Sequence, residues 1–222
     1  MRQTFDQELE KLNEEFTLMG KMVENQIENS IGAYLNQDLD LANKVVAKDL
    51  KVNEAQMSLE KKSLELIALQ QPVTSDLRLI VTVLKASSDL ERMGDHAVSV
   101  AKYLLRLKKI ERIVSIEKLI AEMGLNVEKM LDEVLKAFTK EDEDQAIKIA
   151  RSDQNINEIS LSVYKRCLKN MKKKADTIET DTNYMLVANT IERMGDYVTN
   201  ICEWIVYLVK GKLVDLDTDN ML

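Results

Sequence analysis

The sequence predicts an all-α protein made of two tandem homologous three-helix bundles, with six long helices and an internal twofold repeat. Three observations support this prediction. Proline occurs once and glycine six times in 222 residues, a composition typical of long helices rather than turn-rich sheets. Apolar residues recur every three or four positions, as along residues 79–107, which is the spacing of one buried helix face. The segment Glu-Arg-Met-Gly-Asp occurs twice, at residues 91–95 and 192–196.

The repeat extends over both halves of the chain. The two Glu-Arg-Met-Gly-Asp segments are 101 residues apart, whereas the upstream segment that begins at Asp49 matches the one at Asp153, 104 residues later. Two homologous units that differ by one loop deletion explain both offsets. We expect the first unit over residues 1–112 and the second over residues 113–222.

Each unit is expected to run up, down and up as three antiparallel helices, because short connections join antiparallel neighbours. Thr74 or Ser75 is the expected N-cap of the third helix. The breaks between helices are expected near residues 36–38, 71–72, 109–115, 139–141 and 174–177.

Charge and composition argue against several classes of function. With 31 basic and 38 acidic residues the net charge is -7, so attraction to nucleic acid or anionic lipid is not expected to drive function. No apolar run approaches the roughly 20 residues of a membrane span, which favours a cytoplasmic, unexported protein. Cys167 and Cys202 form no metal-binding pair and are expected to be buried thiols. A single histidine and no nucleophile–base or phosphate-loop motif argue against an enzyme.

Acidic residues are expected to gather at one level of each half. Residues equally far from a turn lie side by side in antiparallel helices, and Pro72 is midway between residues 51 and 93. An i, i+4 pair also shares one helix face. Each half should therefore bring together three carboxylates and an amide: Asp49, Asn53, Glu91 and Asp95 in the first, and Asp153, Asn157, Glu192 and Asp196 in the second.

These clusters are candidate metal sites. Like charges held close together cost stability unless a cation lies among them. Oxygen ligands suit Mg²⁺, Ca²⁺, Mn²⁺ or iron and argue against a structural zinc site. Gly94 and Gly195 are expected to allow close helix approach. Two further acidic pairs on the first helix of each half are additional candidate ligands: Glu24 with Glu28, and Glu128 with Asp132.

Two simpler interpretations remain open for these clusters. In the first, the carboxylates form a solvated helix face. In the second, Arg92 and Arg193 from a neighbouring helix or subunit neutralise the carboxylates. His96 corresponds to Tyr197 in the second half, so we expect a packed or surface histidine rather than a ligand.

The segments at residues 70–78 and 89–97, together with the repeat, resemble the PhoU family of phosphate-signalling proteins. The resemblance implies two three-helix bundles whose acidic motifs hold multinuclear metal clusters, iron first, with zinc, manganese or magnesium as alternatives. It also implies a cytoplasmic negative regulator that links the ATPase of the phosphate ABC transporter to a sensor histidine kinase. A homodimer is a further expectation, and contact with the membrane is expected only through these partners.

The chain departs from the family pattern in ways that make its halves unequal. Asn53 and Asn157 stand where the family often has aspartate, and an amide binds hard metals more weakly. Asn200 and Glu203 continue the family pattern only in the second half and are further candidate ligands there. Two other functions compete with a metal-binding adaptor: a metal-free adaptor, and a ferritin-like storage protein or oxidase. The ferritin-like reading needs two Glu-x-x-His pairs, which one histidine does not supply.

Overall fold

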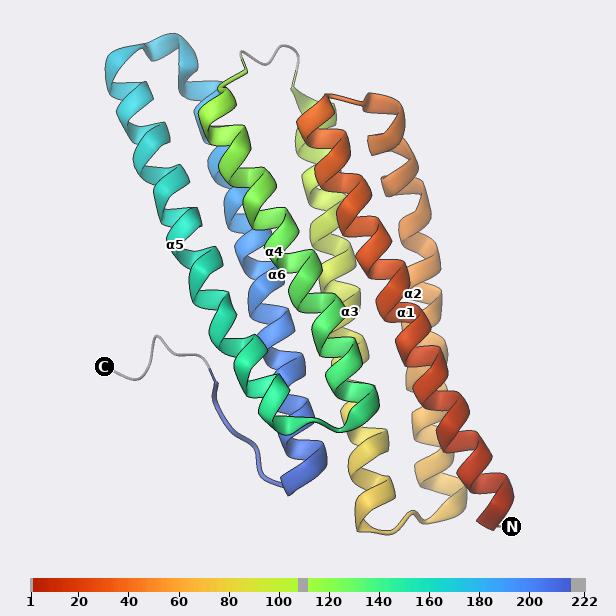
Figure 1. Cartoon of the computed structure of the whole chain (residues 1–222). Helices are drawn as coiled ribbons and strands as arrows, with labels where there is room; N and C mark the ends of the chain where they lie inside the picture. Colours follow the sequence, from red (N-terminus) through yellow and green to blue (C-terminus); the bar gives the residue numbers. More distant parts are fainter. Residues whose placement is uncertain (1, 108–111, 217–222) are drawn as a thin grey trace.

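The computed structural model describes residues 2–107 and 112–216, and within these ranges it contains helices and no strand (Figure 1). The prediction of an all-α chain with six long helices is confirmed. The helices are α1 (Arg2–Asn36), α2 (Leu39–Gln70), α3 (Thr74–Arg106), α4 (Val114–Lys140), α5 (Glu143–Lys173) and α6 (Ile178–Lys210), with a 3-10 turn, η1 (Ala175–Thr177), before α6.

The turns between the first two helices of each half are copies of each other. Gln37 and Glu141, 104 residues apart, both adopt the left-handed conformation, with φ of 56° and 51°. The next residues, Asp38 and Asp142, each accept a hydrogen bond of 2.9 Å from the backbone N–H three residues on. These side chains satisfy N–H groups that the first helical turn leaves unpaired. The duplication seen in the sequence is therefore present in the backbone as well.

The N-cap expected for α3, Thr74 or Ser75, is wrong by one or two residues. Val73 is the N-cap and makes no side-chain capping bond, while Thr74 is the first helical residue. The backbone N–H of Leu77 donates to the carbonyl of Val73 at 2.9 Å. Because this bond already closes the first turn, the hydroxyls of Thr74 and Ser75 lie too far inside the helix to cap it.

The other expected breaks fall at or next to helix ends. The break near residues 109–115 coincides with the end of α3 and the start of α4, although residues 108–111 lie outside the described part of the chain. The unit boundary between residues 112 and 113 adjoins this segment and stays a prediction.

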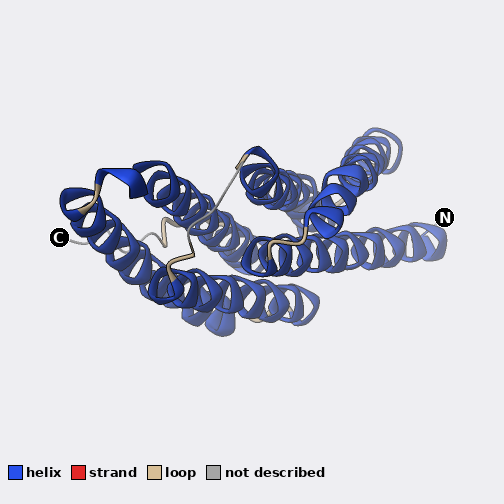
Figure 2. Ribbon diagram, turned by 90° about the horizontal axis from the view of Figure 1, so that it is seen from above, coloured by secondary structure: helices blue, strands red, loops and turns tan. Residues whose placement is uncertain are grey.

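The two halves share one hydrophobic core. The outer helices α2 and α5 pack on the other two helices of their own half, whereas α1 packs on α4 and α3 packs on α6 across the halves. Buried apolar side chains from all six helices form a single cluster. Viewed along the bundle, the helices of the two halves lie side by side (Figure 2). Within the described residues, no helix contains an apolar stretch of the length that a membrane span requires.

Reciprocal glycine contacts align α1 with α4. A Cβ built on Gly20 would overlap the side chain of Leu135, and one built on Gly124 would lie 2.6 Å from Cδ1 of Ile31. Gly20 corresponds to Gly124 and Ile31 to Leu135, each pair separated by 104 residues. Each glycine thus leaves room for a branched side chain of the other half, and the contact obeys the twofold symmetry of the repeat.

Candidate metal centres

The first-half cluster is organised by a close contact between α2 and α3. A Cβ built on Gly94 would lie 3.3 Å from Cγ1 of Val52, so the two backbones approach at this level. Asp49 precedes Val52 by one helical turn, and Glu91 precedes Gly94 in the same way. Burial, then the charges of Asp95 and Asp49, raise the pKa of Glu91. The structure therefore brings Asp49, Glu91 and Asp95 into one electrostatic neighbourhood, at the level that the hairpin geometry predicts.

The amide of this cluster has an unused acceptor. Oδ1 of Asn53 is buried and has no hydrogen-bond donor among the described residues. Buried carbonyl oxygens normally find a partner, so this atom is suited to receive a cation. Asp95, in contrast, is exposed. The cluster thus combines a buried amide oxygen with a carboxylate at the surface.

The second-half cluster is more tightly packed. The side chain of Asp153 is only 8% exposed, and a Cβ built on Gly195 would overlap its Oδ1. Asn157 donates its amide to Oδ2 of Asp153 at 3.1 Å, while Oδ1 of Asn157 is buried and has no donor within the described chain. The Ser160 hydroxyl donates to Oε2 of Glu192 at 2.6 Å. Contacts within the protein thus already engage one carboxylate oxygen of Asp153 and one of Glu192.

The donor chemistry of both clusters fits a hard cation, although the side chains do not converge on one point. Within residues 2–107 and 112–216, no group of three or more His, Cys, Asp or Glu side chains is gathered closely enough to hold a metal ion. The unpartnered oxygens of Asn53 and Asn157 nevertheless add neutral donors to each set of carboxylates, and such mixed oxygen sets are what Mg²⁺, Mn²⁺ and Ca²⁺ prefer. Metal binding at these clusters stays a prediction.

The two extra candidates on α6 have other partners. Asn200 donates its amide to Oδ1 of Asp89 on α3 at 3.4 Å. Oε1 of Glu203 accepts a 2.8 Å bond from the backbone N–H of Leu216, which attaches the segment after α6 to that helix. These contacts link α6 to α3 and to the end of the described chain.

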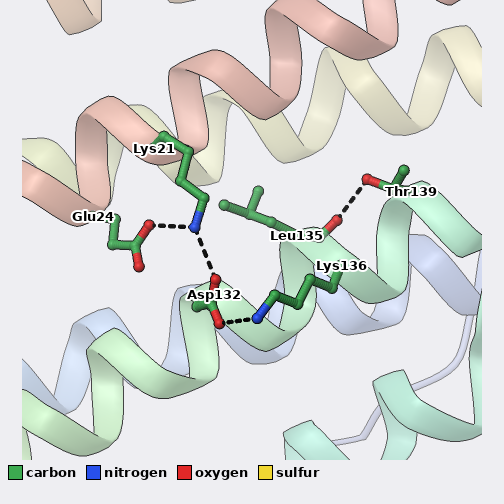
Figure 3. Close-up of polar contacts among 6 residues, drawn as sticks. All are labelled: Lys21, Glu24, Asp132, Leu135, Lys136 and Thr139. Atoms are coloured by element: carbon green, nitrogen blue, oxygen red, sulfur yellow. Dashed lines mark hydrogen bonds and ion pairs between the residues drawn. The ribbon is translucent and has the colours of Figure 1, made fainter.

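The acidic pairs of the first helices meet each other rather than the clusters. Lys21 on α1 donates to Glu24 at 2.7 Å and to Asp132 on α4 at 2.8 Å, and Lys136 bonds the other oxygen of Asp132 at 2.5 Å (Figure 3). The charges of Glu28 and Glu24, after burial, raise the pKa of Glu128. All four carboxylates therefore lie along the contact between α1 and α4, where Lys21 and Lys136 pair with Glu24 and Asp132.

The arginine and histidine of the duplicated segments lie along the contact between α3 and α6. The His96 ring stacks on Tyr197, its counterpart in the second half, with centroids 5.5 Å apart. Burial, then the charge of Arg193, lowers the pKa of His96 to about 4. The guanidinium of Arg92 lies 5.9 Å from the centroid of the same tyrosine ring. His96 is thus a packed residue, and Arg92 is directed to a neighbouring helix, with Tyr197 as its contact.

Sequence reasoning missed one residue at the first cluster, Gln26 on α1. Its amide nitrogen donates to Oδ1 of Asp49 at 3.4 Å. Hairpin geometry relates α2 to α3 but does not place α1, so nothing in the turn positions pointed to it. The one signal was an amide within the apolar stripe of α1, at a position where the second half has Met130.

Together, the fold and the clusters define a class of protein: a tandem repeat of three-helix units with an acidic cluster on the outer hairpin of each. The PhoU domain model matches the chain twice, at residues 16–104 and 120–205. The chain belongs to the PhoU family, which confirms the resemblance.

Relatives match over almost the whole chain. A phosphate-specific transport system accessory protein PhoU homolog from Streptococcus pneumoniae is 36% identical and covers 98% of this chain and 100% of its own length. The Escherichia coli accessory protein PhoU is 35% identical over 94% of this chain and 86% of its own. The crystal structure of the phosphate transport system regulatory protein PhoU from S. pneumoniae superposes with a TM-score of 0.90 at 34% identity, covering 95% of this chain and 99% of that one. PhoU from Pseudomonas aeruginosa has a TM-score of 0.88 at 30% identity, covering 94% and 100%.

Proposed function

We propose that the chain is a negative regulator of phosphate uptake and of the phosphate-starvation response. In this role it acts as an adaptor between the ATPase of the phosphate ABC transporter and a sensor histidine kinase. One observation carries the proposal: the match to the S. pneumoniae accessory protein covers 98% of this chain and 100% of that one. Because the likeness is not confined to one unit, it supports a shared role for the whole protein in a phosphate transport system.

The outer helices offer apolar surface for such partners. On α2, Leu50, Met57 and Leu64 are spaced seven residues apart and are 65%, 67% and 52% exposed. On α5, Leu161 and Leu168 occupy the positions equivalent to Met57 and Leu64 and are also exposed. Apolar residues at a spacing of seven follow one face of a helix, which is the pattern that a partner helix packs against. We infer that partners dock on α2 and α5.

In the proposed role, the acidic clusters hold multinuclear metal clusters, iron first, with zinc, manganese or magnesium as alternatives. The first cluster draws its ligands from α2 and α3, and the second from α5 and α6. A bound cation supplies positive charge that offsets the repulsion among the carboxylates. The carboxylates hold the ion by charge, and the buried amide oxygens of Asn53 and Asn157 add neutral donors. Occupancy would therefore fix each outer helix, and the surface it presents, against the core.

A metal-free adaptor is the second candidate function, and a specific observation favours it. In the second half, Asn157 and Ser160 already donate hydrogen bonds to Asp153 and Glu192. Those bonds offset part of the cost of burying carboxylates without any ion. Both candidates share the regulatory role and differ only in what stabilises the clusters.

The regulatory role is tested in a strain of the source organism that lacks the gene. We expect a phosphate-starvation reporter to stay active in high phosphate, and the unmodified gene to restore repression. The double variant Leu64→Asp/Leu168→Asp should fail to restore repression and should lose pull-down of the transporter ATPase and the kinase. Leu18→Asp is the matched control, because Leu18 is 63% exposed and belongs to α1, which is not an outer helix. Normal repression in the deletion strain would contradict the proposal.

A further inference from the structure

Gln26 is polar, whereas the equivalent residue of the second half is apolar. Its side chain is 5% exposed, and the equivalent residue of the second half, Met130, is 3% exposed. The two side chains are alike in length, so packing alone does not distinguish them. A buried amide that lacks hydrogen bonds lowers stability. The first half therefore keeps an amide at a position where its own repeat shows that a thioether fits.

The amide of Gln26 lies between α2 and α3. Its nitrogen donates to Oδ1 of Asp49 at 3.4 Å, and its oxygen Oε1 would be 3.3 Å from a Cβ built on Gly94. The reverse orientation would place the amide oxygen against the carboxylate of Asp49, which is repulsive. With the nitrogen turned to Asp49, Oε1 is left buried and without a donor anywhere in the described chain.

Gly94 lies on α3 one helical turn after Glu91 and next to Asp95, so Oε1 of Gln26 lies against the part of α3 that carries the first cluster. Gly195 is the equivalent glycine of the second half, and Oδ1 of Asp153 occupies the space that a Cβ on Gly195 would take. Each half therefore places one side-chain oxygen over its glycine. The oxygen comes from a neutral amide on α1 in the first half and from a carboxylate on α5 in the second.

We propose that Gln26 is an oxygen donor of the first-half cluster, adding an amide from α1 to the candidate ligands on α2 and α3. The inference rests on the metal binding of the proposed function and specifies it further. Two neutral side-chain oxygens of this half, those of Gln26 and Asn53, are buried and have no donor within the described chain. The second half has Met130 in place of Gln26, so the two sites have different ligand sets.

The test measures Mn²⁺ binding by titration calorimetry in a background in which Asp153→Asn and Asp196→Asn disable the second cluster. Gln26→Met introduces the residue that the chain already accommodates at position 130, and Gln26→Glu keeps an oxygen but loses the N–H group. We expect Gln26→Met to weaken Mn²⁺ binding about tenfold or more, and Gln26→Glu to retain it. Thermal unfolding in the presence of a chelator shows that each variant is folded.

Three outcomes would overturn the inference, and they are distinguishable from one another. Equal Mn²⁺ affinity in the background protein and in Gln26→Met would remove Gln26 from the site and leave the proposed function intact. Loss of binding in both Gln26→Met and Gln26→Glu would assign the residue to orienting Asp49 through its N–H group. Absence of Mn²⁺ binding in the unmodified protein would also remove the metal from the proposed function, while the reporter strain tests the regulatory role separately.

Discussion

Gly195 is a position where one added methyl group should be costly. A Cβ there would overlap Oδ1 of Asp153 and lie 3.2 Å from Cδ1 of Ile156, so the buried carboxylate would have to move. Alanine is favoured over glycine in a helix interior by about 1 kcal/mol, whereas overpacking a close contact costs about 1 to 3 kcal/mol. We expect Gly195→Ala to lower the free energy of unfolding by about 1 kcal/mol.

Gly32 provides the matched control, because it lies inside α1 and a Cβ there would meet nothing within 4 Å. Gly32→Ala should therefore raise the free energy of unfolding by about 1 kcal/mol. The two variants then differ by about 2 kcal/mol, or about 4 to 8 °C in melting temperature for a chain of this length. Urea unfolding and calorimetry measure both. If Gly195→Ala proved as stable as Gly32→Ala, the close contact between α5 and α6 would not exist as described.

Two further predictions concern thiols and ion pairs. Burial raises the pKa of Cys167 to about 12 and also raises that of Cys202. Near pH 8 both thiols should therefore resist a thiol reagent until the protein is denatured. Equal rates of thiol modification in the folded and the denatured protein would refute this. Lys136 and Lys21 hold the pKa of Asp132 below its ordinary value, so the carboxylate adds stability above that value and loses it as the pH falls. Lys21→Met should therefore cost about 0.5 kcal/mol near neutral pH, and the cost should shrink as the pH falls and Asp132 becomes protonated; a cost independent of pH would contradict the ion pairs.

Much of the fold was predictable because long helices joined by short turns follow simple geometry. The 104-residue offset located equivalent turns, and Asp38 and Asp142 cap α2 and α5 alike. The same geometry placed Asp49 near Glu91, since positions equally far from a hairpin turn lie at one level.

Contacts that do not pass through a hairpin turn were not predictable in this way. Glu24 and Glu28 were considered beside the metal clusters, yet they lie toward α4 because Gln26, two residues from each, faces α2 and α3. Two residues correspond to about 200° around a helix, which separates the two faces. The docking of α1 on α4 and of α3 on α6 depends on a second apolar face of each helix, and the spacing of apolar residues alone does not say which helix covers it.

The metal content of the protein tests the central claim about the duplicated clusters most directly. Protein purified without chelator is compared by elemental analysis with an Asp95→Asn/Asp196→Asn variant, which removes one carboxylate from each cluster and keeps the side-chain shape. We predict bound iron, or another metal that oxygen ligands accept, in the unmodified protein and its loss in the variant. Equal and negligible metal in both samples would contradict metal binding and leave the metal-free adaptor as the function of this fold.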